Sequence, residues 1–435
     1  MEMTGAKILM ECLLEQGVDL VFGYPGGTIL NVYDELYKYR DRITHILTAH
    51  EQGASHAADG YARSTGKVGV CLATSGPGAT NLITGIATAY MDSVPLVAIT
   101  GQVNSELLGR DVFQEADITG ACEPFTKHSY LVKRAEDLPR VFKEAFHIAS
   151  TGRPGPVLID VPVDIQQAEV PEFVYPEKAA IIGYKPRTQG HAIQIRKAVE
   201  AIEKAQRPII CCGGGVVLAG AREELIAFAK NSGIPVCATM MGIGVIPMDN
   251  PYYLGMIGMH GRSSANRAMK EADLVILCGA RVGDRAVSAP QQIAEKAVVI
   301  HIDIDPAEIG KNMPVDIPIV GDIRIAVGEA AADLLCVALG NGDDLQILAE
   351  VLLVAARAVD TCNVAAGVRA VVGGIQRQGG DLRVDGSLLI FGERVAVSLC
   401  RVIEGIGVGS VDQALIGEVI GPGLAGLFVI DLLVE

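Results

Sequence analysis

Short apolar runs alternate with helix-like segments along the first 170 residues of the chain. Apolar residues at helical spacing predict a helix over residues 4–16, with Thr4 as its N-cap. Four apolar runs predict buried strands, at residues 18–22, 69–73, 96–100 and 157–161. Runs of this length, separated by helical stretches, are typical of a parallel sheet that is covered on both faces.

The same alternation returns after a break in composition. Residues 171–190 are rich in Pro, Glu and Lys, and we interpret them as a linker. Further strands are predicted at residues 208–212, 273–278 and 298–303. The sequence therefore predicts an α/β protein with two doubly wound parallel-sheet domains, at residues 1–170 and 191–335, the second of them Rossmann-like.

The remaining residues differ in composition. Residues 336–435 contain no Lys, His, Tyr or Trp, and the last lysine of the chain is Lys311. Their apolar stretch at 415–434 includes Glu418 and Asp431, so a membrane-spanning helix is not expected. This tail stays unassigned; a shifted reading frame, an artificial junction or a mispredicted gene would each explain it.

Composition and charge narrow the classes of function. Half of the residues are apolar and a fifth are charged, which excludes a disordered chain. The formal net charge of −15 argues against a partner that is nucleic acid or an anionic membrane surface. The ten cysteines are scattered without a CxxC pair, which argues against structural zinc and favours a reducing compartment. The amino-terminal segment lacks the pattern of a signal peptide, and we expect a cytoplasmic protein.

Two short motifs follow predicted strands. Glu51 comes after the apolar Ile46 and Leu47, so its carboxylate is expected at the carboxyl edge of the sheet, where α/β proteins bind ligands. A plain surface acid is the alternative. The loop Thr74-Ser75-Gly76-Pro77-Gly78 can bring backbone amides close to a ligand, although it can also be only a tight turn.

These two motifs occur in order with five others. The series comprises Gly23-Tyr24-Pro25-Gly26-Gly27, His50-Glu51-Gln52-Gly53-Ala54, Asp59-Gly60-Tyr61-Ala62-Arg63, the segment Thr74 to Asn81, Gly101-Gln102-Val103, Val112-Phe113-Gln114-Glu115 and Gly152-Arg153-Pro154-Gly155-Pro156-Val157. It resembles the pyrimidine-binding domain of thiamine-diphosphate enzymes, and it looks most like the catalytic, large subunit of the acetolactate synthases. The resemblance runs from about residue 4 to about residue 335.

The resemblance implies roles for residues of the first domain, residues 1–170, as a pyrimidine-binding domain. In the family a glutamate hydrogen-bonds N1′ of the cofactor's pyrimidine and promotes loss of the thiazolium C2 proton, and Glu51 matches that catalytic residue. Phe113 and Gln114 match residues at the substrate pocket, with Gln114 as a polar contact to the 2-oxo acid. Cofactor contacts are implied for Tyr24, Pro25, Gly26, Gly27, Pro77 and Asn81. Lys127 also fits the family pattern, either as a catalytic residue or as a surface or interface lysine.

The second domain, residues 191–335, has features of the family's FAD site. A glycine cluster after a strand is weak evidence alone, but here it occurs with further motifs at strand ends. FAD contacts are implied for Arg187, Gly213, Gly214, Gly215, Thr239, Met259, His260, Gly279, Ala280, Arg281, Arg285, Asp303, Ile304 and Asp322. The family usually has Arg-Phe-Asp-Asp-Arg where this chain has Arg281-Val282-Gly283-Asp284-Arg285, and the carboxylate missing at Gly283 puts the FAD affinity in doubt.

The third domain of the family is not recognisable. Its Mg²⁺-binding pattern, Gly-Asp-Gly followed by Asn-Asn, does not occur in residues 336–435, so no metal ligand is assigned. The resemblance implies thiamine diphosphate, FAD and Mg²⁺ as cofactors, a homodimer or tetramer, and a small regulatory subunit. It also implies a transferase that condenses two pyruvate molecules, or pyruvate and 2-oxobutyrate, with loss of CO₂. The products would be 2-acetolactate or 2-aceto-2-hydroxybutyrate, in the biosynthesis of isoleucine and valine.

Three other functions stay open at this point. The chain can be a non-catalytic fragment that binds FAD or partner subunits, which the missing Mg²⁺ pattern favours. It can be another thiamine-diphosphate decarboxylase or oxidase of 2-oxo acids, although the run Phe113-Gln114-Glu115 favours a synthase. A nicotinamide oxidoreductase is the weakest alternative, because no G-x-G-x-x-G follows a predicted strand.

Overall fold

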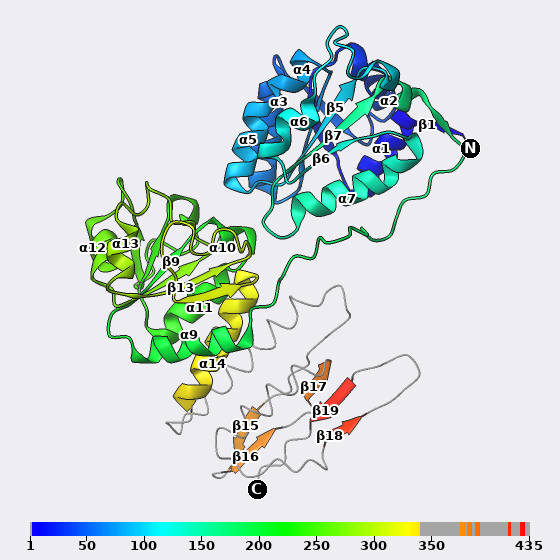
Figure 1. Ribbon diagram of the computed structural model, residues 1–435. Coiled ribbons are helices and arrows are strands. Elements are labelled where there is room, and N and C mark those ends of the chain that lie inside the picture. The colour runs from blue at the N-terminus through cyan, green and yellow to red at the C-terminus, as the bar shows by residue number, and fades with distance from the viewer. Residues whose placement is uncertain are drawn as a thin grey trace. The chain divides into compact units, whose positions relative to one another are not determined.

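The computed structural model describes residues 2–339 and, beyond them, five short strands (Figure 1). The described chain divides into two compact units, with the division between Pro186 and Arg187. The predicted α/β class with two parallel sheets is confirmed. The exact domain boundaries given above stay predictions.

The first unit, blue to cyan in Figure 1, is built on a sheet of six strands in the order β3-β2-β4-β5-β7-β6. Its strands are β2 (Leu20–Gly23), β3 (Thr44–Leu47), β4 (Gly69–Ala73), β5 (Leu96–Gln102), β6 (His128–Leu131) and β7 (Pro156–Pro162). Every pair of neighbours in this sheet is parallel. The carboxyl ends of all six strands therefore meet at one edge of the sheet.

Helices cover both faces of this sheet. They are α1 (Gly5–Glu15), α2 (Leu30–Lys38), α3 (Glu51–Thr65), α4 (Pro77–Asn81), α5 (Ile83–Asp92), α6 (Ile118–Cys122), α7 (Leu138–Ser150) and α8 (Val163–Gln167), with 3₁₀ turns η1 (Gly27–Ile29), η2 (Ser105–Leu107), η3 (Glu123–Phe125) and η4 (Ala135–Asp137). Successive strand residues point to opposite faces, so Val70 packs with α1, α2 and α7 whereas Cys71 packs with α3 and α5. Thr4 caps α1 as predicted, because its hydroxyl accepts the amide N–H of Lys7 at 3.3 Å.

The second unit, green to yellow in Figure 1, is a second parallel sheet in the order β11-β10-β9-β12-β13-β14. Its strands are β9 (Pro208–Cys212), β10 (Val236–Ala238), β11 (Tyr253–Met256), β12 (Leu274–Cys278), β13 (Val298–Asp303) and β14 (Ile317–Val320). Its helices are α9 (Ala192–Lys204), α10 (Gly214–Leu218), α11 (Arg222–Ser232), α12 (Ser263–Glu271), α13 (Pro290–Ala294) and α14 (Ile323–Leu339), with the 3₁₀ turn η5 (Met240–Gly242). Counted from β9, this is the strand order of doubly wound nucleotide-binding folds.

The segment predicted as a linker has no helix or strand, but part of it lies on the first unit. It follows the short strand β8 (Glu169–Val170), which pairs antiparallel with β1 (Met3–Thr4). Side chains that include Phe173, Tyr175 and Tyr184 pack against the core of the first unit. Aromatic residues within a polar segment thus hold it in place by burying apolar surface.

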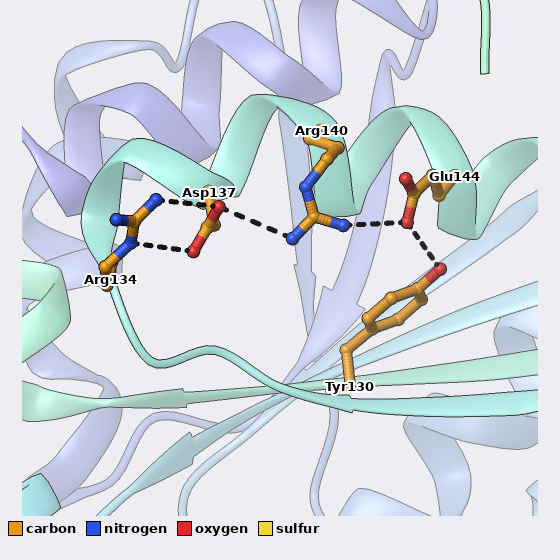
Figure 2. A network of polar contacts seen from close by, with 5 residues as sticks. All are labelled: Tyr130, Arg134, Asp137, Arg140 and Glu144. Atoms are coloured by element: carbon orange, nitrogen blue, oxygen red, sulfur yellow. Dashed lines mark hydrogen bonds and ion pairs between the residues drawn. The ribbon is translucent and has the colours of Figure 1, made fainter. Parts of the chain in front are cut away.

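A chain of polar contacts joins β6 to α7 on the first unit (Figure 2). The hydroxyl of Tyr130 donates to Oε2 of Glu144 at 3.0 Å, and Arg140 reaches the same oxygen at 3.0 Å. Arg140 also contacts Asp137, which in turn accepts from Arg134 at 3.1 Å. Because the side chain of Glu144 is only about a tenth exposed, its two contacts contribute more to stability than the contacts that Arg134 and Arg140 make with Asp137.

The described part of the predicted tail comprises the end of α14, which runs past residue 335 to Leu339, and five short strands. They are β15 (Ile375–Gln378), β16 (Asp381–Val384), β17 (Leu388–Phe391), β18 (Ile416–Glu418) and β19 (Leu427–Ile430). β15 pairs with β16, and β19 pairs with both β17 and β18, all antiparallel. The rest of residues 340–435, and with it most of the unassigned tail, lies outside the described residues.

Seven cysteines of the described residues are free and buried, three in the first unit and four in the second. Burial raises the pKa of the Cys71 thiol to about 12 and that of Cys122 to about 11. No helix among the described residues has the length and apolar character needed to cross a membrane.

Candidate functional site

The first candidate site lies where the strand order of the first sheet reverses. β2 and β4 are neighbours, but the chain passes through β3 on the far side of β2 before it reaches β4. Such a reversal leaves a crevice at the carboxyl ends of the two strands, where α/β folds bind ligands. The loop Tyr24 to Gly27 follows β2 and the loop from Thr74 follows β4, so the structure brings both predicted loops to this crevice.

Glu51 is the first residue of α3 and is only 9 % exposed. His50 caps the helix, because its Nδ1 accepts the amide N–H of Gln52 at 3.1 Å. Nδ2 of Asn81, at the end of α4, donates to Oε2 of Glu51 at 2.9 Å. The other oxygen, Oε1, lies 3.2 Å from the position that a Cβ would take on Gly78, so glycine there leaves room beside the carboxylate. Two of the predicted site residues, Glu51 and Asn81, are therefore in direct contact.

Two threonines that sequence reasoning did not single out join the loops. The hydroxyls of Thr28 and Thr74 lie 3.0 Å apart, and Oγ1 of Thr28 accepts the amide N–H of Ser75 at 2.9 Å. A Cβ on Gly26 would lie 2.5 Å from the side chain of Thr74, so only glycine lets the two loops approach this closely. Thr74 begins the motif that runs to Asn81, and Thr28 directly follows the motif that ends at Gly27. Their contact could not be predicted, because it depends on how the fold brings the two loops together.

Gln114 lies on the loop between β5 and α6, next to the glycine loop. Its φ is +58°, the left-handed region that non-glycine residues rarely adopt. A Cβ on Gly76 would come within 2.7 Å of the backbone oxygen of Gln114, so the two loops touch through their backbones. Glu115 holds the turn before it, because its carboxylate accepts the backbone N–H groups of Gly109 and Val112, and these bonds lower its pKa.

The exposure of the other residues at this site varies. Phe113 is 87 % exposed and Tyr24 is 43 % exposed, so both present large apolar surfaces beside the crevice. Pro77 is the first residue of α4, and Gly27 is the first residue of η1. Tyr24 and Gly27 follow β2, Pro77 follows β4 and Phe113 follows β5, so all four lie beyond the carboxyl ends of neighbouring strands.

Lys127 lies away from this crevice and binds the linker instead. Its Nζ donates to the backbone oxygens of Ile148 and Thr151, the latter at 2.7 Å, and to the hydroxyl of Tyr184 at 3.0 Å. The hydroxyl of Tyr184 in turn donates to the oxygen of Thr151 at 2.8 Å. Lys127 therefore serves to attach residues beyond 170 to the first unit, a role that neither sequence interpretation contained.

The second candidate site occupies the corresponding edge of the second sheet. Gly213 follows β9 and Gly279 follows β12, the two strands at which the strand order reverses. The amide N–H of Gly215 donates to the oxygen of Gly279 at 2.9 Å. A Cβ on Gly213 would lie 2.3 Å from that same oxygen. Gly213 and Gly215 are thus needed for the approach of two loops, a requirement that exists without any ligand.

The other residues predicted for this site follow neighbouring strands. Thr239 follows β10, and its amide N–H donates to the oxygen of Cys212 at 2.9 Å. Asp303 ends β13 and accepts the amide N–H of Asp305 at 2.9 Å. The full set after strand ends is Gly213, Gly214, Gly215, Thr239, Gly279, Ala280, Arg281, Asp303, Ile304 and Asp322, and parallel pairing brings these positions to one edge.

Three further predicted residues lie after β11 and β12. Met259 is 66 % exposed, and its sulfur is 3.3 Å from Nη1 of Arg285. His260 follows it and is exposed, and Arg187 is the first residue of the second unit. Beneath this edge lies a residue that sequence reasoning missed, the buried His301 on β13, whose pKa burial lowers to about 4. His301 is therefore neutral near pH 7.

A metal site is not formed by the residues that the structure describes. No group of three or more His, Cys, Asp or Glu side chains among them is placed to hold a metal ion. The Mg²⁺ implied by the resemblance therefore finds no ligand set in residues 2–339.

Comparison with known proteins shows the family of this chain. Residues 3–121 match the N-terminal TPP binding domain of thiamine pyrophosphate enzymes, and residues 195–330 match the central domain of the same enzymes. Together these matches cover more than half of the chain. The chain belongs to the thiamine pyrophosphate enzyme family. Thiamine pyrophosphate is another name for thiamine diphosphate, so the family predicted from the motifs is confirmed.

Several relatives that the chain matches are named as acetolactate synthases. The chain is 51 % identical over 335 residues to a probable acetolactate synthase large subunit of Methanocaldococcus jannaschii, covering 77 % of this chain and 56 % of the relative. It is 54 % identical over 322 residues to the acetolactate synthase large subunit of Corynebacterium glutamicum, covering 74 % and 51 %. It is 50 % identical over 329 residues to the acetolactate synthase large subunit of Haemophilus influenzae, covering 75 % of this chain and 57 % of the relative. The chain thus spans about half the length of the curated relatives that it matches.

Proposed function

We propose that residues 1–335 form the pyrimidine-binding and central domains of an acetolactate synthase. The reaction would be the condensation of two pyruvate molecules, or of pyruvate and 2-oxobutyrate, with loss of CO₂. The observation that carries the proposal is the buried Glu51, held by Asn81 in the crevice between β2 and β4 of a domain that matches TPP binding domains. About half of all positions are identical to large subunits with this name.

The residues present fit the pyrimidine ring of thiamine diphosphate. Glu51 is buried, one of its oxygens accepts from Asn81, and Gly78 leaves space beside the other. When bound, the cofactor supplies a carbon nucleophile that adds to the carbonyl of a 2-oxo acid. Glu51 would share a proton with N1′ of the pyrimidine, and Asn81 would keep the carboxylate aimed at that atom. A charge-assisted hydrogen bond to a carboxylate as buried as that of Glu51 is strong enough to bias the proton's position.

Gln114 and Phe113 would contact the substrate. Both lie on the loop that touches Gly76, so they are close to the glycine loop of the same crevice. The amide of Gln114 can donate to a 2-oxo acid carboxylate, and the ring of Phe113, which is 87 % exposed, can shield the site from water.

FAD would occupy the edge of the second sheet. The reversal of strand order between β9 and β12 and the glycine loop that follows β9 support this assignment. Arg281, Arg285 and Asp303 would contact it from neighbouring loops, whereas Gly283 offers no side chain. FAD would be structural, because the overall reaction is redox-neutral.

The assembly is also part of the proposal. Relatives named as large subunits imply a small regulatory partner, and we expect a homodimer or tetramer. Buried, free cysteines are compatible with the reducing cytoplasm. No step is assigned to Mg²⁺, because the described residues offer no ligand set for it.

The test is an assay of the purified chain with pyruvate, thiamine diphosphate and Mg²⁺, with and without FAD. Acetolactate formation supports the proposal, and Glu51→Gln should slow exchange of the cofactor's C2 proton about 10²- to 10⁴-fold. Gln52→Glu, which changes a neighbouring residue on α3, is the control. A Glu51→Gln effect below about threefold would remove Glu51 from the proposed mechanism.

A second candidate is a FAD-binding chain without turnover. The lack of a metal ligand set among the described residues favours it. Flavin fluorescence quenching by the chain, together with no acetolactate at any cofactor concentration, would support this second function and contradict the first.

A further inference from the structure

The first sheet buries a carboxyl group that the proposed chemistry does not use. Asp160 on β7 is 1 % exposed, and both of its oxygens accept hydrogen bonds. Oγ1 of Thr100 donates to Oδ1 at 2.7 Å, and Nε2 of Gln102 donates to Oδ2 at 2.9 Å. Thr100 pairs directly with Asp160 across β5 and β7, so the register of the sheet places these groups together.

Gln102 extends this contact out of the sheet. It ends β5 and is 3 % exposed. Its Nε2 also donates to the backbone oxygen of Ala116 at 2.9 Å, and its Oε1 accepts the amide N–H of Val103 at 2.9 Å. All hydrogen-bonding groups of this amide except one lone pair are therefore used, which fixes its orientation. One side chain thus links the buried carboxyl group to the loop that ends at Ala116.

The loop held in this way is the one that carries Phe113 and Gln114. Between Val103 and Ala116 it contains two non-glycine residues in the left-handed region, Asp111 at +54° and Gln114 at +58°. Such conformations persist only where the surroundings hold them. The contact of Gln114 with Gly76 and the hydrogen bond from Gln102 to Ala116 hold this loop at two positions that are close together in the sequence.

Burial favours the neutral form of the acid at the centre of this cluster, although the hydrogen bonds from Thr100 and Gln102 lower its pKa. Burial raises the pKa of Asp160 to about 7, and the nearby carboxylate of Asp117 acts in the same direction. The thiol of Cys122 also faces Asp160. A neutral carboxyl group still accepts from Gln102, so the link to the loop does not need a charge.

We propose that Asp160 and Gln102 are positioning residues, which hold the loop of Phe113 and Gln114 against the glycine loop and thereby set the substrate contact. The statement about substrate rests on the proposed function, whereas the statement about the loop rests on the hydrogen bonds alone. No step of the reaction is assigned to either residue.

The loop contains a trypsin site that reports its attachment. Arg110 is exposed and lies between Val103 and Ala116, the two residues whose backbones contact the amide of Gln102. In the full chain, Gln102→Met should speed cleavage after Arg110 about tenfold, the factor expected when a hydrogen bond of this kind is lost. Ile99→Val, on the same strand, removes one buried methyl group and should leave this cleavage unchanged. A wild-type rate in Gln102→Met would overturn the proposal.

Asp160 is tested by a conservative and a disruptive variant. Asp160→Asn keeps an oxygen for Gln102 and can donate to Thr100, so cleavage after Arg110 should stay slow. Asp160→Ala should match Gln102→Met, because Gln102 then loses its buried partner. Cleavage of Asp160→Ala at the wild-type rate would show that Asp160 does not position the loop.

Kinetics separate positioning from loss of stability. Gln102→Met should raise KM for pyruvate at least fivefold while kcat changes less than about twofold, because the affected contact is one of substrate binding. A fall in kcat alone, or the same values as Ile99→Val, would contradict the substrate part. If the wild-type chain shows no turnover, the proposed function has failed, and the cleavage rates still decide the loop part.

Discussion

The burial of Asp160 predicts that the first unit loses stability as the pH rises from about 4 to about 7. Burial raises the pKa of its carboxyl group from 3.8 to about 7, an effect that the hydrogen bonds from Thr100 and Gln102 partly offset and that Asp117 increases. The folded state therefore keeps this proton up to about pH 7, whereas the unfolded chain releases it near pH 4. The folded state binds this proton more tightly than the unfolded chain does. The stability that the bound proton contributes is therefore fully present below the pKa of the unfolded chain, and it is lost as the pH rises through the pKa of the folded state.

The size of the effect follows from the difference between the two pKa values. Each unit of difference corresponds to about 1.4 kcal/mol, so a difference of about three units gives a ceiling of about 4 kcal/mol. Within the window the free energy of unfolding should fall by about 1.4 kcal/mol per pH unit, and above pH 7 this contribution should be flat. Such a change is a large share of the 5–15 kcal/mol that is typical of a domain.

Hydrogen exchange of the backbone amides in β5 and β7 measures the free energy of unfolding of the first unit separately from that of the second. We would compare the wild-type chain with Asp160→Asn from pH 4.5 to 8, after correction for intrinsic exchange rates. Asparagine has the same shape and no titrating group, so its profile should lack this slope. The difference between the two profiles cancels the contribution of every other titrating residue.

Two results would refute this reasoning. Parallel profiles would mean that Asp160 titrates in the folded state as it does in the unfolded chain. A wild-type profile that rises with pH relative to Asp160→Asn would mean that the hydrogen bonds from Thr100 and Gln102 outweigh burial and favour the charged carboxylate.

Three further variants test other contacts. Lys127→Met removes three donated hydrogen bonds and should destabilise the first unit by about 2–4 kcal/mol, with faster hydrogen exchange of the linker amides. Unchanged exchange rates of the linker amides would contradict the role of Lys127 in attaching the linker. Tyr130→Phe removes the hydroxyl that donates to Glu144 in Figure 2 and should lower the free energy of unfolding in denaturant titrations by about 1 kcal/mol. Tyr37→Phe is the control, because this side chain is 67 % exposed, and it should lower the free energy of unfolding by under about 0.5 kcal/mol. Gly213→Ala should lower the free energy of unfolding of the second unit by about 1–3 kcal/mol, since its Cβ would meet the backbone oxygen of Gly279 at 2.3 Å. Gly214→Ala should cost less, because its nearest contact is the Cβ of Met241 at 3.1 Å, and equal losses would count against the close approach of the loops.

Continuous apolar runs made the central strands predictable. β4, β9 and β13 have the predicted bounds, and β5 and β7 differ only at their ends. These strands are almost entirely buried, so their sequences are mostly apolar, and polar residues such as Thr100 and Asp160 are few. β6, β11 and β14 were not predicted, because each has only four residues and at least two of the four are partly exposed. β10 is buried but has only three residues, too few to form a pattern.

The candidate sites were predictable only where one motif contained the chemistry. Glu51 and Asn81 were placed by their motifs, and the structure shows that they touch. Asp160 and Gln102 lie 58 positions apart, and their contact depends on the register of β5 against β7, which a single sequence does not reveal. The attachment of Lys127 to Tyr184 has the same origin, since it joins a strand to a segment without helix or strand.

The buried cysteines allow the opening of each unit to be followed separately. Because thiolates are the reactive form, thiols with raised pKa values react with alkylating reagents only after the surrounding core has opened. Cys71 reports the first unit, and Cys212, whose pKa burial raises to about 12, reports the second. Alkylation rates read peptide by peptide would therefore rank the stabilities of the two units in one sample, without an added label and in a chain that has no tryptophan.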